Sequence, residues 1–155
     1  MQLLINQYIY NNIFLEIFKN FFSLKEWANF LVLLPMNNEV KIAYFSMEIG
    51  ISNNIPTYSG GLGVLAGDTI KSGADLKIPM VAVTLLSKKG YFRQDIDSDG
   101  RQIEYPIDWD PSKFLIRLSR KIVVQIEGRD VYIQAWRYNV QSVTGGKVDV
   151  IYLDT

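Results

Sequence analysis

The stretch that decides the fold of this chain is residues 57–68, which read TYSGGLGVLAGD. Glycines at 60, 61 and 63 lead into an amphipathic run, and a candidate strand at residues 41–45 lies shortly before them. Glycine lets a backbone approach a ligand closely, and the start of a helix adds a partial positive charge. The stretch therefore predicts a strand-to-helix turn that is suited to an anion or a sugar.

The residues on either side of this turn indicate an α/β arrangement. Residues 40–45 are a short apolar run, as in a buried strand. Apolar and small residues then recur at helical spacing from Leu62 to Leu76, and Pro79 ends the helix before a second apolar run at 80–86. Strand, glycine turn, helix and strand form a βαβ unit, so we expect two parallel strands.

The second half of the chain has the pattern of hairpins. Residues 91–94 and 102–105 flank a turn at 97–100, and residues 122–126 and 131–138 flank another at 127–130. After Gly145 and Gly146, residues 148–153 have the pattern of a further central strand. Because only two residues follow that strand, we expect one face of the sheet to be exposed and the chain to stop inside a larger fold.

The composition excludes several kinds of site. The 155 residues suffice for one domain, and their net charge of zero gives no case for a nucleic-acid partner. The chain has no cysteine and no histidine, which removes disulfides, thiol chemistry, the Ser-His-Asp arrangement and the usual zinc ligands. We therefore expect no metal site, and a cytoplasmic location is compatible with the composition.

Residues 1–35 differ from the rest and are rich in Ile, Leu, Phe, Tyr and Asn. Polar residues interrupt the apolar run too often for a membrane span, and neither a basic start nor a cleavage site indicates a signal peptide. An amphipathic helix packed on the domain and a membrane-associated segment are both possible interpretations. We favour a third, in which Met36 is the natural start and residues 1–35 are an apolar N-terminal extension.

Taken alone, the glycine turn is a weak signal. It does not fit the dinucleotide-binding pattern G-x-G-x-x-G in its usual register, and no P-loop motif occurs. A tight turn with glycines kept for packing and a ligand-binding turn are equally good interpretations of it. Glu48 follows the first strand, where α/β sheets bind ligands, but a loop glutamate more often caps a helix or is solvated.

Two further kinds of residue are candidates for ligand contact. Arg93 could clamp a phosphate or a carboxylate, although a surface strand arginine is the commoner case. Four aromatic residues of the second half could stack on sugar faces, although hairpin aromatics usually serve packing: Tyr105, Trp109, Trp136 and Tyr138.

Several segments in the same order resemble the α-glucan (glycogen/maltodextrin) phosphorylase family, most of all its short bacterial and archaeal form. They are residues 42–48 (IAYFSME), 55–68 (IPTYSGGLGVLAGD), 71–76 (KSGADL), 78–83 (IPMVAV) and 89–94 (KGYFRQ). The resemblance runs from about residue 40 to residue 155 and leaves residues 1–35 uncovered. Tyr58 and Ser59 depart from the longer forms of the family, which places side-chain contacts of the turn in doubt.

The resemblance implies a fold, an activity and a cofactor. Members of the family use phosphate to release α-glucose 1-phosphate from an α-1,4-glucan, at a cleft between two Rossmann-like domains. Residues 36–155 would be part of the N-terminal Rossmann-like domain of such a GT-B-type glycosyltransferase, with β-hairpin insertions. The family's pyridoxal 5′-phosphate is held by a lysine of the other domain, which has no counterpart here; Lys88 and Lys89 are not that lysine.

The resemblance also assigns residue roles. The substrate- and phosphate-binding residues would be Gly60, Gly61, Leu62, Gly63 and Glu48, with backbone N–H groups stabilising negative charge. No catalytic residue would lie within the chain, so we expect an N-terminal fragment that is inactive alone, with an α-1,4-glucan and phosphate or glucose 1-phosphate as the partners of the whole enzyme. Two alternatives remain. One is a fragment of a starch or glycogen synthase-like glycosyltransferase, and the other is a non-catalytic glucan-binding or interaction module whose contact surface is an exposed sheet face and the apolar leader, residues 1–35.

Overall fold

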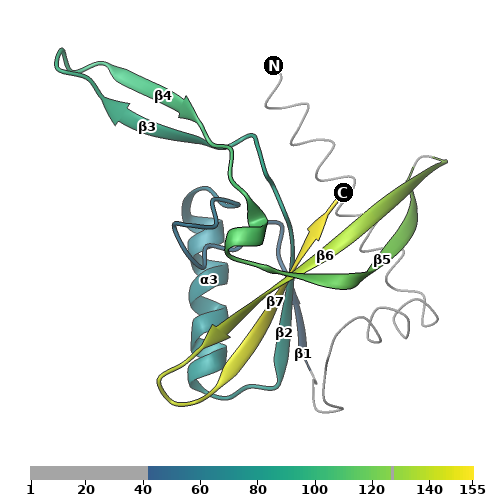
Figure 1. The fold of residues 1–155 in the computed structure, drawn as a ribbon. Helices are drawn as coiled ribbons and strands as arrows, with labels where there is room; N and C mark the ends of the chain where they lie inside the picture. The colour runs from purple at the N-terminus through teal and green to yellow at the C-terminus, as the bar shows by residue number, and fades with distance from the viewer. Residues whose placement is uncertain (1–41, 127) are drawn as a thin grey trace.

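The computed structural model describes residues 42–126 and 128–155 (Figure 1). The expected extension at residues 1–35 lies outside this part of the chain. The described elements are β1 (Ile42–Phe45), α3 (Gly60–Asp75), β2 (Met80–Leu85), β3 (Phe92–Ile96), β4 (Gln102–Pro106), the 3₁₀ turn η1 (Pro111–Lys113), β5 (Ile116–Ile126), β6 (Arg129–Gln141) and β7 (Lys147–Asp154).

A five-stranded mixed sheet in the order β1-β2-β7-β6-β5 forms the body of the molecule. The strands β1, β2 and β7 are parallel, with Ile42 opposite Met80 and Val83 opposite Ile151, whereas β7, β6 and β5 are antiparallel. The helix α3 lies along the sheet in Figure 1 and links β1 to β2. The predicted βαβ unit and the α/β class are therefore confirmed.

Both predicted hairpins are present. The strands β5 and β6 extend the main sheet, and their register shifts between Arg117 and Lys121. The strands β3 and β4 form a separate two-stranded sheet that projects from the body (Figure 1). All five residues of β3 are exposed, so this hairpin contributes little to the core.

The core consists of two apolar clusters on opposite faces of the sheet. The first joins α3 to the sheet through side chains such as Ile70, Val150 and Tyr152. The second contains Val83 and Ile151, which are 1% and 0% exposed. The expectation that one face of the sheet is exposed is therefore wrong for β2 and β7. The non-catalytic alternative loses one of the two surfaces on which it depended; the other, the apolar leader, lies outside the described residues.

The helix packs closely because its buried stripe is made of small residues. Five of its six buried residues are glycine or alanine, and the sixth is Ile70: Gly63, Ala66, Gly67, Gly73 and Ala74. Small side chains let a helix backbone approach its neighbours. The helices in the described part of the chain are all too short or too polar to cross a membrane.

Candidate substrate-binding site

The glycine turn lies where β1 leads into α3. The helix starts at Gly60, whose φ of +71° is a conformation that glycine adopts without strain. A Cβ atom added at Gly60 or Gly61 would have no heavy atom within 4 Å, and Leu62 is 54% exposed. The turn is thus open to solutes on the side of these three residues.

The first-turn N–H groups of α3 receive no side-chain cap from the N-cap residue. The side chain of Ser59, at the N-cap position, makes no hydrogen bond to the helix. No described side chain accepts a hydrogen bond from the backbone N–H groups of Gly60, Gly61 or Leu62. These first-turn donors have no partner within the helix, so a bound anion or a hydroxyl would find free donors there.

Glu48 supports this turn from behind. Its Oε2 accepts a hydrogen bond from the backbone N–H of Ser59 at 2.8 Å and lies 3.3 Å from the hydroxyl of Tyr91. The carboxylate therefore anchors the residue that precedes the helix. At this position a negative charge also interacts favourably with the helix dipole. The structure favours the capping interpretation of Glu48.

The remaining glycines of the motif serve packing. A Cβ atom at Gly63 would lie 2.6 Å from Cβ of Tyr58, and one at Gly67 would lie 2.0 Å from the carbonyl oxygen of Gly50. The backbone N–H of Gly50 in turn donates to the carbonyl oxygen of Gly63 at 2.7 Å. Of the four predicted turn residues, Gly60, Gly61 and Leu62 are therefore open, whereas Gly63 holds the preceding loop against α3.

Arg93 and Tyr105 lie on the projecting hairpin. The guanidinium of Arg93 lies 4.9 Å from the ring centre of Tyr105, and both residues are exposed. The residue of this segment that reaches the glycine turn is Tyr91, whose hydroxyl is 3.3 Å from both Glu48 Oε2 and the carbonyl oxygen of Thr57. Sequence reasoning missed this tyrosine, although it lies in the same short motif as Arg93.

The other predicted aromatic residues have structural partners. Trp109 donates from Nε1 to the carbonyl oxygen of Ser87 at 3.0 Å, and Tyr138 packs against the first apolar cluster. After Trp109, Asp110 caps η1 by accepting hydrogen bonds from the side chain and backbone of Ser112, which lower the pKa of its carboxyl. These contacts stabilise the loop between β4 and β5.

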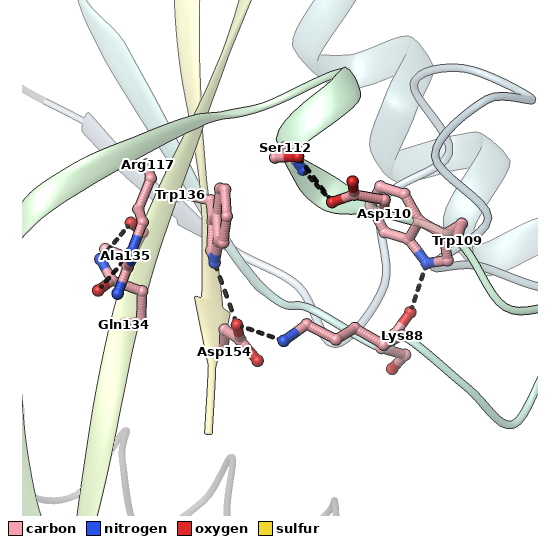
Figure 2. A network of polar contacts seen from close by, with 10 residues as sticks. Lys88, Trp109, Asp110, Ser112, Arg117, Gln134, Ala135, Trp136 and Asp154 are labelled. Atoms are coloured by element: carbon pink, nitrogen blue, oxygen red, sulfur yellow. Dashed lines mark hydrogen bonds and ion pairs between the residues drawn. The ribbon is translucent and has the colours of Figure 1, made fainter.

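A polar network at the carboxyl ends of β2 and β7 was not predicted (Figure 2). Asp154 Oδ2 lies 2.8 Å from Nζ of Lys88 and accepts a hydrogen bond from Nε1 of Trp136 at 3.1 Å. Lys88 thus forms an ion pair with Asp154. The network arises because β2 and β7 are adjacent parallel strands, an adjacency that the sequence does not reveal.

Titratable groups inside the described core are few. Tyr152 is 0% exposed, burial raises the pKa of its hydroxyl, and that hydroxyl has no hydrogen-bond partner among the described residues. The described lysines are all exposed, so none has the buried setting of a Schiff-base lysine. Residues 42–126 and 128–155 contain no group of three or more acidic side chains that could hold a metal ion.

Comparison with known proteins gives a consistent result. The chain is 46% identical over 124 residues to maltodextrin phosphorylase of Thermococcus litoralis, a match that covers 76% of this chain and 14% of that protein. It is 40% identical over 119 residues to glycogen phosphorylase of Mycobacterium tuberculosis, covering 74% of this chain and 14% of the relative. Glycogen phosphorylase of Aquifex aeolicus matches at 32% over 123 residues, covering 74% of the chain and 17% of the relative.

No family model matches the chain. These three relatives are named maltodextrin or glycogen phosphorylase, and the chain spans only 14–17% of their length. By sequence, therefore, the chain is homologous to one segment of the glycogen and maltodextrin phosphorylase family.

Proposed function

We propose that this chain is the N-terminal part of an α-1,4-glucan phosphorylase and supplies one wall of its substrate cleft. The observation that carries the proposal is the open turn at Gly60, Gly61 and Leu62, whose first-turn N–H groups no described side chain occupies. Backbone donors held in this way stabilise negative charge without reorganisation. They would contact the phosphate and the terminal glucosyl unit.

The turn has the rigidity that such a role requires. Glu48 fixes Ser59 from one side, and the bond between Gly50 and Gly63 fixes the preceding loop against the helix. A donor that is already in place loses less free energy on binding than one that must be ordered. The proposed roles of Glu48 and Gly63 are thus to position the turn, whereas the ligand contacts come from the other three residues.

We further propose that the fold is the Rossmann-like half of a GT-B-type glycosyltransferase, comprising residues 36–155. Pyridoxal 5′-phosphate, which would supply acid–base chemistry through its phosphate, fits none of the described lysines, because all of them are exposed. The cofactor lysine would therefore belong to another part of the enzyme. On this proposal the chain alone is inactive and acts in the cytoplasm only as part of a larger protein.

A chimera tests the proposal directly. The matching segment of the T. litoralis maltodextrin phosphorylase is replaced by this chain's segment, and phosphate release from α-glucose 1-phosphate is measured with maltodextrin as the acceptor. We expect an active chimera, and at least a tenfold loss of activity with Gly61→Val, because the added side chain would occupy the space above the turn. Ser72→Val, which adds the same kind of side chain at an exposed position of the same helix, should leave activity unchanged.

Three results would contradict the proposal. A chimera that melts cooperatively but has no activity would show that the segment cannot form the cleft. Equal activity of the Gly61→Val and Ser72→Val chimeras would remove the turn from the site. Clear turnover by residues 1–155 alone would refute the expected inactivity.

A further inference from the structure

Tyr91 directly precedes β3, and its side chain reaches back from the base of the projecting hairpin to the glycine turn. Its hydroxyl lies 3.3 Å from Glu48 Oε2 and 3.3 Å from the carbonyl oxygen of Thr57, which are 43 and 34 residues away along the chain. Both contacts are partly shielded from solvent. The function proposed above assigns donors and supports to the turn but gives Tyr91 no role.

The backbone holds Tyr91 on both sides. Gly90, which precedes it, has a φ of +105°, a value that residues with a side chain rarely adopt. The backbone N–H of Ile107 donates to the carbonyl oxygen of Tyr91 at 3.1 Å and closes the base of the hairpin. Two side-chain torsions then place the hydroxyl, so little conformational entropy is lost when it is held in one position.

The carboxylate of Glu48 connects Tyr91 to the glycine turn. One oxygen, Oε2, receives both the backbone N–H of Ser59 at 2.8 Å and the hydroxyl of Tyr91 at 3.3 Å. The hydroxyl of Ser46 donates to the backbone carbonyl of Glu48 at 2.8 Å, which leaves the side-chain torsions of Glu48 to be fixed by other contacts. No described lysine or arginine lies within 4.0 Å of this carboxylate, so the phenol is the described side chain that holds it.

We propose that Tyr91 is a positioning residue for the glycine turn, an inference that rests on the function proposed above. Its hydroxyl proton is shared between Glu48 and the carbonyl oxygen of Thr57, so one group restrains the chain just before the helix at two points. Without this hydroxyl, Glu48 would hold Ser59 for a smaller fraction of the time. The N–H groups of the turn would then be less well aligned with the charge that develops during phosphorolysis, which lowers the rate more than the affinity.

Amide hydrogen exchange of the full chain tests the positioning role without any turnover. In Tyr91→Phe, the N–H of Ser59 should exchange roughly threefold to tenfold faster, because its acceptor is less restrained. Tyr132→Phe is the matched control, since it removes the same hydroxyl from a side chain that is 63% exposed on β6, and it should leave Ser59 unchanged. The N–H of Gly50, which donates to Gly63, should keep its exchange rate in both variants.

Two results of this experiment would overturn the inference. One is unchanged exchange of Ser59 in Tyr91→Phe, and the other is equal acceleration at Ser59 and Gly50, which would indicate general loosening of the loop. The native chain supplies a test that needs no variant. Its Ser59 amide should be more strongly protected than that of Gly61, which no described side chain accepts, and equal protection would also refute the inference.

The chimera described above tests the consequence for the reaction. Tyr91→Phe should lower kcat roughly threefold to tenfold and leave KM for maltodextrin within about twofold, whereas Tyr132→Phe should change neither. In a Glu48→Ala chimera, Tyr91→Phe should cost less than half as much, because its main effect passes through that carboxylate. An equal cost in both backgrounds, or a raised KM with unchanged kcat, would overturn the inference. An inactive parent chimera would overturn the proposed function alone, because the exchange of Ser59 decides the role of Tyr91 without turnover.

Discussion

Replacing Gly67 by alanine tests the contact between α3 and the loop that precedes it. The added Cβ would lie 2.0 Å from the carbonyl oxygen of Gly50 and 2.8 Å from its carbon, and real Cβ contacts essentially never fall below 3.0 Å. The obstacle is backbone, so it cannot be relieved by rotating a side chain. Either the helix or the loop carrying Gly50 must therefore move by about 1 Å.

The magnitude follows from two opposing terms. Alanine is favoured over glycine within a helix by about 0.8–1.0 kcal/mol. Overpacking costs about 1–3 kcal/mol, and the upper end applies here because the contact is between backbone atoms. The expected net loss is about 2 kcal/mol, which for a chain of this length lowers the Tm by roughly 4–8 °C.

Thermal melting followed by circular dichroism measures this effect, with Gly61→Ala as the control. The methyl group at Gly61 meets no heavy atom within 4 Å, so that variant should not be destabilised and should gain up to about 1 kcal/mol from helix propensity. If Gly67→Ala melted at the same temperature as the native chain, the loop would not be seated on α3, and the support described for the turn would be wrong.

Three further substitutions probe other contacts. Glu48→Ala removes the carboxylate that accepts the N–H of Ser59, and should lower the free energy of unfolding in urea by about 1.5–3 kcal/mol; an unchanged midpoint would refute the anchoring role. Tyr152→Phe removes a buried hydroxyl without a partner and should not lower the Tm. Burial raises the pKa of Tyr152 above its ordinary 10.0, so its contribution is complete below pH 10 and is lost as the pH rises toward the folded-state pKa. The variant should therefore be less sensitive to alkali, and identical melting profiles above pH 10 would contradict this. Hydrogen bonds from Ser112 lower the pKa of Asp110 below 3.8, so its stabilisation is present above that pH and is lost as the pH falls. Melting of Asp110→Asn at pH 2–6 should show a shallower acid dependence than the native chain, and a steeper one would be contrary evidence.

Helices and strands whose apolar residues recur at regular spacing were predictable from sequence, and those in which this spacing is interrupted were not. The βαβ unit was found because apolar runs, glycines and Pro79 mark its boundaries. The strand β5 was expected only from residue 122, whereas it begins at Ile116. The register shift between Arg117 and Lys121 breaks the two-residue alternation there, so the sequence carries no regular signal for the first half of this strand.

The roles of the glycines could not be separated without the structure. A missing Cβ leaves space for a neighbour or for a ligand, and the sequence does not show which. Gly67 lies against Gly50 and Gly61 faces open space, although both belong to one motif. The capping role of Glu48 followed from a general preference of loop glutamates. Its partner, Ser59, could not be predicted, because the contact depends on how the loop between β1 and α3 folds back on Glu48.

The polar network at Asp154 was missed for a different reason. Lys88 and Asp154 are far apart in the sequence, and they meet because β7 inserts beside β2 rather than at the edge of the sheet. Hydrophobic patterns identify a strand without giving its position in a sheet. Contacts between strand ends are therefore beyond what a single sequence can predict.

The projecting β3–β4 hairpin begins and ends at nearly the same point. The backbone N–H of Ile107 donates to the carbonyl oxygen of Tyr91 at 3.1 Å, so the chain leaves and re-enters the body through adjacent residues. A short linker could replace residues 92–106 without displacing Tyr91 from the glycine turn. Natural insertions and deletions, or an engineered affinity tag, should thus be tolerated in this arm while the body keeps its shape.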